Sequence, residues 1–219
     1  MLSLQLPPSD EPLQVLCLGA HADDIEIGSG ATFLRLQESG RALAVTWVVF
    51  SAAGVRRDEA LASAELFLAR AKSKEILIKS FRDGFLPYQG AEVKAVFEDL
   101  KRQAAPDVIL THYGRDAHQD HRLISELTWN TYRNHLILEY EIPKYDGDLG
   151  SPNVFTHLDK RLCQQKSDHI VSSFRSQSGR QWFSEETFLA LSRLRGIESN
   201  APGGYAEGFY CRKLVLGES

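Results

Sequence analysis

The sequence predicts an α/β fold, in which helices cover both faces of a mostly parallel sheet. Short apolar runs alternate with longer amphipathic stretches from residue 13 to residue 140, which is the pattern of parallel strands joined by crossover helices. The composition is that of a globular protein, with 43% apolar and 25% charged residues, and this excludes disordered, collagenous and coiled-coil proteins. The length of 219 residues suits one domain better than two full-sized ones.

The first four elements follow from their residue types. An apolar run over 15–19, with turn residues behind it, predicts a buried strand. Apolar residues at helical spacing predict a helix over 27–39, closed by Gly40 as its C-cap. The stretch 42–50 is rich in Val, Trp and Phe and predicts a second buried strand. Residues 56–71 are rich in Ala and Leu and predict a helix.

The alternation then continues to residue 140. Further strands are expected over 75–78, 108–110 and 136–140, and further helices over 91–104 and 120–134. The remainder is less regular: we expect loops over 145–153 and 201–204, helices over 156–171 and 184–195, and a last strand over 208–216. No linker separates this part, so residues 1–219 are expected to form a single domain.

Charge, hydropathy and cysteine usage narrow the class of protein. The net charge of −4, without a basic stripe, argues against a nucleic-acid partner. The longest apolar run, 42–50, is too short for a membrane span, and MLSLQLPPSDEP lacks the features of a signal peptide. The three cysteines, Cys17, Cys163 and Cys211, are scattered. We therefore expect a reduced, cytoplasmic protein without a disulfide framework.

Residues suited to chemistry follow two of the predicted strands. In parallel sheets, ligands bind at the carboxyl ends of the strands. Residues 19–28 follow the first strand and include His21, Asp23 and Asp24, while residues 112–122 follow the strand that ends at Leu110. These two segments should therefore lie at the same edge of the sheet.

The first segment places His21, Asp23, Asp24 and Glu26 within six residues. Gathering three carboxylates near a buried strand end costs desolvation and mutual repulsion, which a divalent cation removes. A His and an Asp with an open position are typical of catalytic zinc, and the second segment supplies a further His, His118 or His121. Magnesium and calcium prefer all-oxygen sites, so the ligand types favour zinc or a related first-row metal.

The adjacent pair Asp23-Asp24 adds a catalytic implication. One carboxylate can bind the metal while the other addresses the metal-bound water, whose pKa the metal lowers to about 7. This is the equipment of a metal-assisted hydrolase. The structural alternative is that an Asp simply caps the following helix, and that His118-Gln119-Asp120-His121 is a solvated helix start.

With these motifs the sequence resembles the zinc-dependent PIG-L/LmbE-like deacetylases. Ala20-His21-Ala22-Asp23-Asp24-Ile25-Glu26 resembles the family motif A-H-P-D-D-x-E, His118-Gln119-Asp120-His121 resembles H-x-D-H, and Tyr205-Ala206-Glu207-Gly208-Phe209 resembles Y-A-E-x-F. The resemblance spans nearly the whole chain with order and spacing kept. It implies a Rossmann-like α/β fold, which agrees with the alternation of strands and helices.

The resemblance also implies roles for the motif residues. His21, Asp24 and His121 would be the zinc ligands, and Asp23 would be the general base that activates the zinc-bound water. His118 would protonate the leaving amine as general acid or, as imidazolium, stabilise the oxyanion.

Three further residues receive supporting roles from the resemblance. Asp120 would hold His118 in its tautomer and orientation. Arg56, in an R-x-x-E pattern, would face the substrate or the released acetate. Some family members carry a tyrosine as oxyanion donor where this chain has Asp116, and Tyr205 is our replacement candidate for that role. Ala22 replaces the proline of the family motif, which loosens the turn slightly but removes no ligand.

The predicted activity is zinc-dependent hydrolysis of an N-acetyl group from an amino sugar or glycoconjugate. One alternative is a metal hydrolase of another acyl bond, such as an ester or a thiol-conjugate amide. The other is a non-catalytic binding relative, for example a receiver-like module, but Ser51-Ala52-Ala53-Gly54 lacks the acid that a receiver needs after that strand. The expected partner is a small N-acetylated sugar, and a homo-oligomer remains possible.

Overall fold

The computed structural model describes residues 3–4 and 10–215. Its seven strands are β1 (Leu13–His21), β2 (Leu43–Ser51), β3 (Ser73–Ile78), β4 (Val108–His112), β5 (Leu136–Tyr140), β6 (Val154–Leu158) and β7 (Tyr205–Tyr210). They form one sheet in the order β3-β2-β1-β4-β5-β7-β6. Strands β1 to β5 pair in parallel, whereas β7 is antiparallel to both β5 and β6. The predicted mostly parallel sheet is thereby confirmed.

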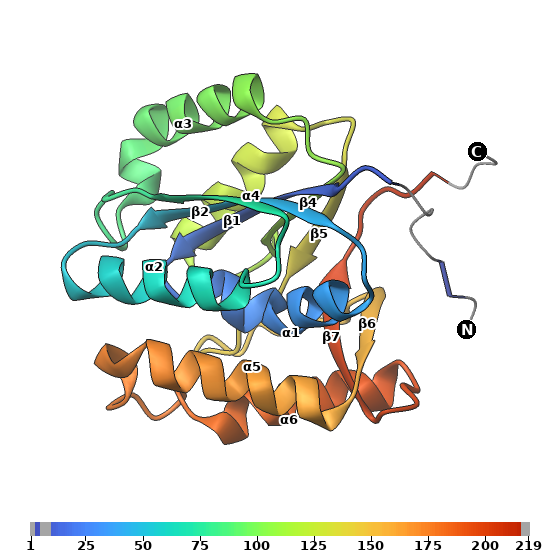
Figure 1. Cartoon of the computed structure of the whole chain (residues 1–219). Coiled ribbons are helices and arrows are strands. Elements are labelled where there is room, and N and C mark those ends of the chain that lie inside the picture. The colour runs from blue at the N-terminus through green and yellow to red at the C-terminus, as the bar shows by residue number, and fades with distance from the viewer. Residues whose placement is uncertain (1–2, 5–9, 216–219) are drawn as a thin grey trace.

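Helices lie on both faces of this sheet, as predicted (Figure 1). The α-helices are α1 (Asp24–Glu38), α2 (Val55–Phe67), α3 (Gly90–Gln103), α4 (Gln119–Thr131), α5 (Lys160–Ser173) and α6 (Glu185–Glu198), and the short 3-10 helices are η1 (Leu86–Gln89) and η2 (Arg175–Gln177). Helices α3 and α4 pack together on one face, and α1 and α2 lie on the other, where α5 covers them and α6 packs on α5 and β7. Within the described part of the chain, no helix combines the length and apolarity needed to cross a bilayer.

The core consists of two apolar clusters, one on each side of the sheet. On the α1 side, Phe33 and Phe67 pack with Trp47 of β2, and on the α3 side Phe50 packs against Phe97. Strand β1 lies centrally between β2 and β4, and its residues from Val15 to Ala20 are all buried. The carboxyl end of β1 is therefore held rigidly in the middle of the sheet edge.

Two glycines allow α1 to approach its neighbours closely. A Cβ added to Gly28 would lie 2.2 Å from the Tyr140 ring, and one added to Gly30 would lie 2.7 Å from the Phe67 ring. Both distances are shorter than any real Cβ contact. The Gly28-Ser29-Gly30 segment therefore serves close helix packing, and not a dinucleotide loop of the G-x-G-x-x-G type.

The structure corrects two predicted elements in the last third of the chain. The helix expected over 156–171 begins only at Lys160, because Val154–Leu158 forms strand β6. The last strand runs over Tyr205–Tyr210 in place of 208–216, and Leu216 lies outside the described residues. Strand β6 pairs only with β7, some fifty residues later. Val154, Phe155 and Thr156 are nevertheless residue types that favour strands, and the helix prediction passed over this local signal.

Candidate metal centre

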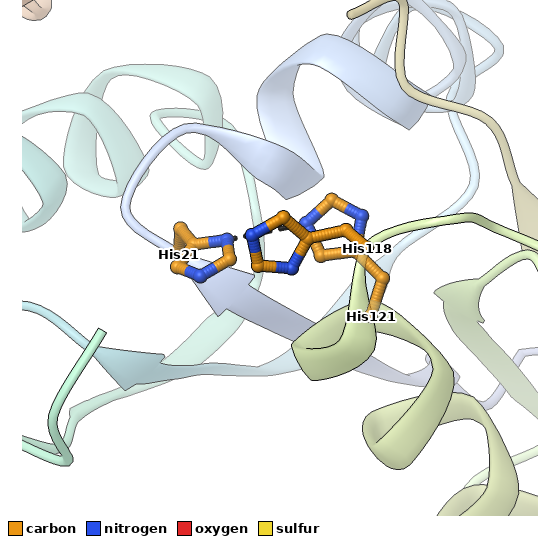
Figure 2. Close-up of side chains that lie close together, drawn as sticks. All are labelled: His21, His118 and His121. Atoms are coloured by element: carbon orange, nitrogen blue, oxygen red, sulfur yellow. Dashed lines mark hydrogen bonds between the residues drawn. The ribbon is translucent and has the colours of Figure 1, made fainter. Parts of the chain in front are cut away.

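The chemistry-bearing residues converge at the carboxyl ends of two neighbouring strands. His21 is the last residue of β1, and Asp24 is the first residue of α1. The neighbouring strand β4 leads through a short loop to α4, where His118 is the N-cap and His121 lies in the first turn. Figure 2 shows the three imidazoles gathered between the end of β1 and the start of α4. The predicted convergence of residues 19–28 and 112–122 is thus observed.

Three side chains at the centre of this cluster, one of them contributing both of its carboxylate oxygens, have atoms at the spacing of metal ligands. The His21 Nδ1 atom lies 3.1 Å from His121 Nε2 and 3.4 Å from Asp24 Oδ2, and His121 Nε2 lies 3.5 Å from Asp24 Oδ1. Ligand atoms bound tetrahedrally to zinc at its usual bond lengths stand about 3.3 Å apart. The three side chains therefore already have the separations that such an ion requires.

In His21 and His121, the ring nitrogen that points away from the cluster centre faces a carboxylate. This contact determines why the other ring nitrogen suits a metal. His21 Nε2 lies 3.2 Å from Asp120 Oδ2 and 3.1 Å from Asp83 Oδ1, and His121 Nδ1 lies 2.9 Å from Asp116 Oδ2. A ring nitrogen that faces a carboxylate carries the hydrogen, which leaves a lone pair on the other ring nitrogen. When His21 is neutral, as a bound cation would make it, two lone pairs and the Asp24 carboxylate face one another, and a cation satisfies all three.

Among the described residues, three overlapping groups have ligand atoms close enough to hold an ion. They are His21, His118 and His121; Asp24, His112 and His121; and His21, Asp83 and Asp120. His112, the last residue of β4, is fully buried, stacks on His121 at 3.9 Å between ring centroids, and lies 3.2 Å from Asp24 Oδ2. The donor set of imidazoles and a carboxylate fits zinc or a similar first-row metal.

Burial and charge set the protonation of these groups. Burial disfavours the charged Asp24 carboxylate, but the surrounding histidines outweigh this and hold its pKa well below the usual value. Burial, together with the charge of His112, lowers the pKa of His121 to about 4, so His121 is neutral near pH 7. Burial also opposes a charge on His21, yet the Asp24, Asp120 and Asp83 carboxylates raise its pKa well above the usual value. In this structure a proton on His21 supplies positive charge that a bound cation would replace.

Asp23 does not act as a helix cap, although it occupies the N-cap position of α1. Its side chain makes no capping hydrogen bond; its Oδ1 atom accepts a hydrogen bond from Arg56 Nη2 at 2.9 Å. Burial raises the pKa of the Asp23 carboxyl, an effect that the Arg56 charge opposes. The capping alternative for Asp23 is therefore excluded, and Arg56 lies in the site, against the predicted general base.

The structure corrects the role predicted for Asp120. Its carboxylate contacts His21 and accepts hydrogen bonds from the Gly84 and Leu86 amides at 2.8 and 3.1 Å, so it does not hold the His118 ring. Only the Asp120 backbone N–H reaches His118, donating to Nδ1 at 3.2 Å. This is a capping contact, so the structural alternative holds in part for His118. The side chain of Asp120 instead orients His21 and ties the 84–86 loop to α4.

Two further carboxylates of the site, those of Asp116 and Asp83, belong to none of the sequence motifs. Asp116 Oδ2 lies 2.9 Å from both His121 Nδ1 and Lys144 Nζ. Asp116 Oδ1 accepts a hydrogen bond from the His118 backbone N–H at 2.8 Å. Burial would raise the pKa of Asp116, but His121 and Lys144 hold it well below the usual value. Asp83 was missed by the sequence reasoning. Its position at the Asp-Gly turn that follows β3 was the one available signal.

Tyr205 does not join the cluster. Its ring lies 5.7 Å from the Arg193 guanidinium, its backbone packs against Gly196, and it pairs with Leu158 of β6. No contact between Tyr205 and the histidine cluster occurs within the described residues, so the structure does not support Tyr205 as an oxyanion donor. Glu207, from the same Y-A-E-x-F segment, is buried and reaches α1.

Residues 16–132 match the protein-family model PIG-L, described as GlcNAc-PI de-N-acetylase. The match covers more than half of the 219 residues. The chain belongs to the PIG-L family. The resemblance drawn from the motifs is thereby confirmed, and the matched range includes the two motif segments that contain His21, Asp24, His118 and His121.

A sequence relative and a solved structure are also similar to this chain. The chain is 30% identical over 139 residues to an uncharacterized deacetylase, YaiS, from Escherichia coli K12, covering 59% of this chain and 74% of the relative. Its fold is similar to that of N,N'-diacetylchitobiose deacetylase from Pyrococcus horikoshii, with a TM-score of 0.68, 22% identity, and coverage of 90% and 83%.

A second solved structure extends the comparison to a different chemistry. GalB from Pseudomonas putida KT2440, a 4-carboxy-2-hydroxymuconate hydratase, has a TM-score of 0.72 at 17% identity, covering 94% of this chain and 99% of the hydratase. At such identities the likeness establishes the fold alone. Because this fold carries more than one reaction, the site residues have to decide the chemistry.

Proposed function

We propose that this member of the PIG-L family is a zinc-dependent hydrolase that removes the N-acetyl group from an amino sugar or glycoconjugate. The observation that carries the proposal is the cluster of His21 Nδ1, His121 Nε2 and the Asp24 carboxylate, spaced at 3.1 to 3.5 Å, with Asp23 beside it. These three residues would hold the zinc. Zinc, when bound, would acidify a coordinated water and polarise the amide carbonyl.

Asp23 is proposed as the general base. Its carboxylate is buried, is not used as a cap, and lies next in sequence to the ligand Asp24. It would take a proton from the attacking water and return it to the departing nitrogen, so that the proton count balances. The Arg56 hydrogen bond to Asp23 Oδ1 fixes the carboxylate and leaves Oδ2 for the water.

We propose that His118, with a neutral imidazole ring, stabilises the oxyanion. Its Nδ1 atom accepts the Asp120 amide, so the ring hydrogen is on Nε2. Burial and the positive charge of His21 lower the pKa of His118, which favours this neutral state. The general-acid role predicted from the resemblance requires a protonated ring and the loss of the capping contact. That role stays a prediction.

The sugar is proposed to bind in a cavity of about 250 Å³ that opens beside His21. Arg56, Arg82 and Asp83 line it, together with the hydroxyl-bearing Ser80. Charged and hydroxyl groups around a small cavity suit the hydroxyls of a sugar. The family description and the diacetylchitobiose deacetylase support an N-acetylated sugar as the substrate class.

We also propose that the chain acts as one deacetylase domain, because strands β6 and β7 from beyond the matched range join the same sheet. Cytoplasmic location, the absence of a nucleic-acid partner and a possible homo-oligomer remain predictions from the composition.

The test is release of acetate from N-acetylglucosamine and from N,N'-diacetylchitobiose by the zinc-loaded protein. We expect acetate and free amine in equal amounts, loss of release after chelation, and recovery on adding zinc. Release of acid from an acetyl ester or a thiol-conjugate amide, with none from any N-acetylated amino sugar, would favour the alternative acyl hydrolase. A protein that binds zinc but cleaves none of these would be a binding relative.

A further inference from the structure

A buried ion pair connects the last third of the chain to α1. Lys166 of α5 and Glu207 of β7 lie 2.6 Å apart, with side chains 5% and 4% exposed. Neither residue belongs to the cluster that would hold the metal. Burying two charges costs several kcal/mol per ion unless further hydrogen bonds satisfy them. The remaining partners of this pair are therefore informative.

Those partners are backbone groups of α1. Lys166 Nζ donates to the Ile27 carbonyl at 2.5 Å, and Glu207 Oε1 accepts the Ala31 amide at 3.0 Å. Glu207 Oε2 accepts the Thr32 amide at 2.7 Å and the Thr32 hydroxyl at 2.6 Å. In a regular helix the Ile27 carbonyl and the Ala31 amide bond to each other. Here each has a charged side-chain partner as well, so the pair clamps one point of α1.

The clamped point is one turn from the catalytic carboxylates. The Ile27 amide donates to the Asp23 carbonyl at 3.0 Å, so the Ile27 peptide is held by Asp23 on one side and by Lys166 on the other. Gly28, the next residue, lies directly against the Tyr140 ring. The first turn of α1 therefore cannot slide or rotate without breaking a charged hydrogen bond or overlapping an aromatic ring.

We propose that Lys166 and Glu207 are positioning residues, which place Asp23 and Asp24 for metal binding and proton transfer. The proposal rests on the proposed function, since it assigns those two carboxylates their roles. It gives the last third of the chain a function in catalysis: residues of α5 and β7 set the geometry of a turn that lies between β1 and α1. Neither residue touches the substrate or the metal.

Two variants test the proposal at different severity. Lys166→Met removes the charge and the Ile27 contact, while Thr32→Val removes only one hydroxyl from Glu207 and keeps the shape of the side chain. Leu100→Ala is the control, because Leu100 is a buried core residue of α3 on the opposite face of the sheet. It lowers stability through packing alone.

The readouts are zinc affinity, measured by competition with a chelator, and kcat and KM at saturating zinc, all at a temperature where every variant is folded. We expect Lys166→Met to weaken zinc binding about tenfold, the lower end of the range for residues that orient ligands, and to lower kcat with little change in KM. Thr32→Val should lower zinc affinity and kcat in the same way, but by less. Leu100→Ala should lower the melting temperature and leave zinc affinity and kcat unchanged.

The proposal is wrong if Lys166→Met and Thr32→Val lower only the melting temperature, as Leu100→Ala does. If Lys166→Met does not fold, Thr32→Val decides alone. Zinc affinity does not depend on turnover, so its measurement distinguishes failure of this proposal from failure of the proposed deacetylase activity. A wild-type protein that binds zinc but releases no acetate would contradict the deacetylase assignment, while the effect of the variants on zinc binding would still support or overturn the clamp.

Discussion

Residues 13–131 and residues 132–215 contribute to the catalytic edge in different ways. The first region holds β1 to β4 and α1 to α4, ends one residue before the family match ends at 132, and carries the proposed metal ligands and base. The second region adds β5 to β7 with α5 and α6, and brings no ligand atom to the cluster within the described residues. Its contacts with the site are instead supporting ones.

Those supporting contacts are charged or aromatic, and they are buried. Lys144 reaches Asp116, Lys166 and Glu207 reach α1, and the ring of Tyr140 packs on Gly28. Under the proposed function, the first region would supply the chemical groups and the second region would fix their positions. Four substitutions, ordered by expected effect, test this division of roles.

The largest effect is expected at Asp23 in the first region. Asp23→Asn keeps the size of the side chain but removes the base, so turnover should fall by about 10³-fold, within the range for general acid–base catalysis. Metal content should stay at the wild-type level, because Asp24 and not Asp23 faces the histidines. The control is Asp58→Asn, an exposed aspartate on α2. Wild-type kcat in the Asp23 variant would remove the general-base assignment.

A smaller effect is expected at Asp116, whose carboxylate contacts one side chain from each region, His121 from the first and Lys144 from the second. Asp116→Asn weakens the hold on the His121 ring and on Lys144, so zinc affinity should fall about 10- to 100-fold. Chelator competition measures this loss directly. An unchanged affinity would mean that His121 is oriented by its stacking on His112 alone.

The contact between the regions is tested at Gly28. A Cβ there would overlap the Tyr140 ring, so Gly28→Ala should lower the free energy of unfolding by roughly 1–3 kcal/mol, as overpacked cores do. Gly90→Ala is the control, because Gly90 is also a glycine within a helix but has open space around it. Denaturant unfolding compares the two. Equal stability of both variants would contradict the close approach of α1 to β5.

The smallest effect is expected at Tyr205 in the second region. Tyr205→Phe removes the hydroxyl that the sequence analysis proposed as an oxyanion donor, and kcat/KM should not change, because the ring packs on α6. A selective drop in kcat would reinstate Tyr205 in the site and give the second region a direct part in the chemistry.

The sequence predicted the first region closely because its signals are local. Apolar runs and helical periodicity marked β1 to β5 and α1 to α4. The rule that ligands bind at strand ends brought residues 19–28 and 112–122 to one edge of the sheet, and only the family resemblance selected His121 over His118 as a ligand. The prediction failed for β6, whose only partner strand is distant in sequence, and for the side chain of Asp120, which turned to His21 instead of His118.

The supporting residues could not be predicted for a physical reason. Lys144, Lys166 and Asp83 are ordinary charged residues in loops and on a helix, and their spacing matches no motif. Their importance comes from burial or from a contact with a residue far along the chain, such as the contact of Lys166 with Ile27. Such contacts exist only once the sheet and its helices have assembled.

The metal content of the purified protein tests the central claim most directly. The claim is that His21, Asp24 and His121 form a metal centre. Mass spectrometry should find close to one zinc per chain in the wild type and in His157→Ala, a control on the edge strand β6, and almost none in His121→Ala. A wild-type chain that holds no metal after zinc supplementation, or a His121→Ala chain that keeps it, would contradict the account.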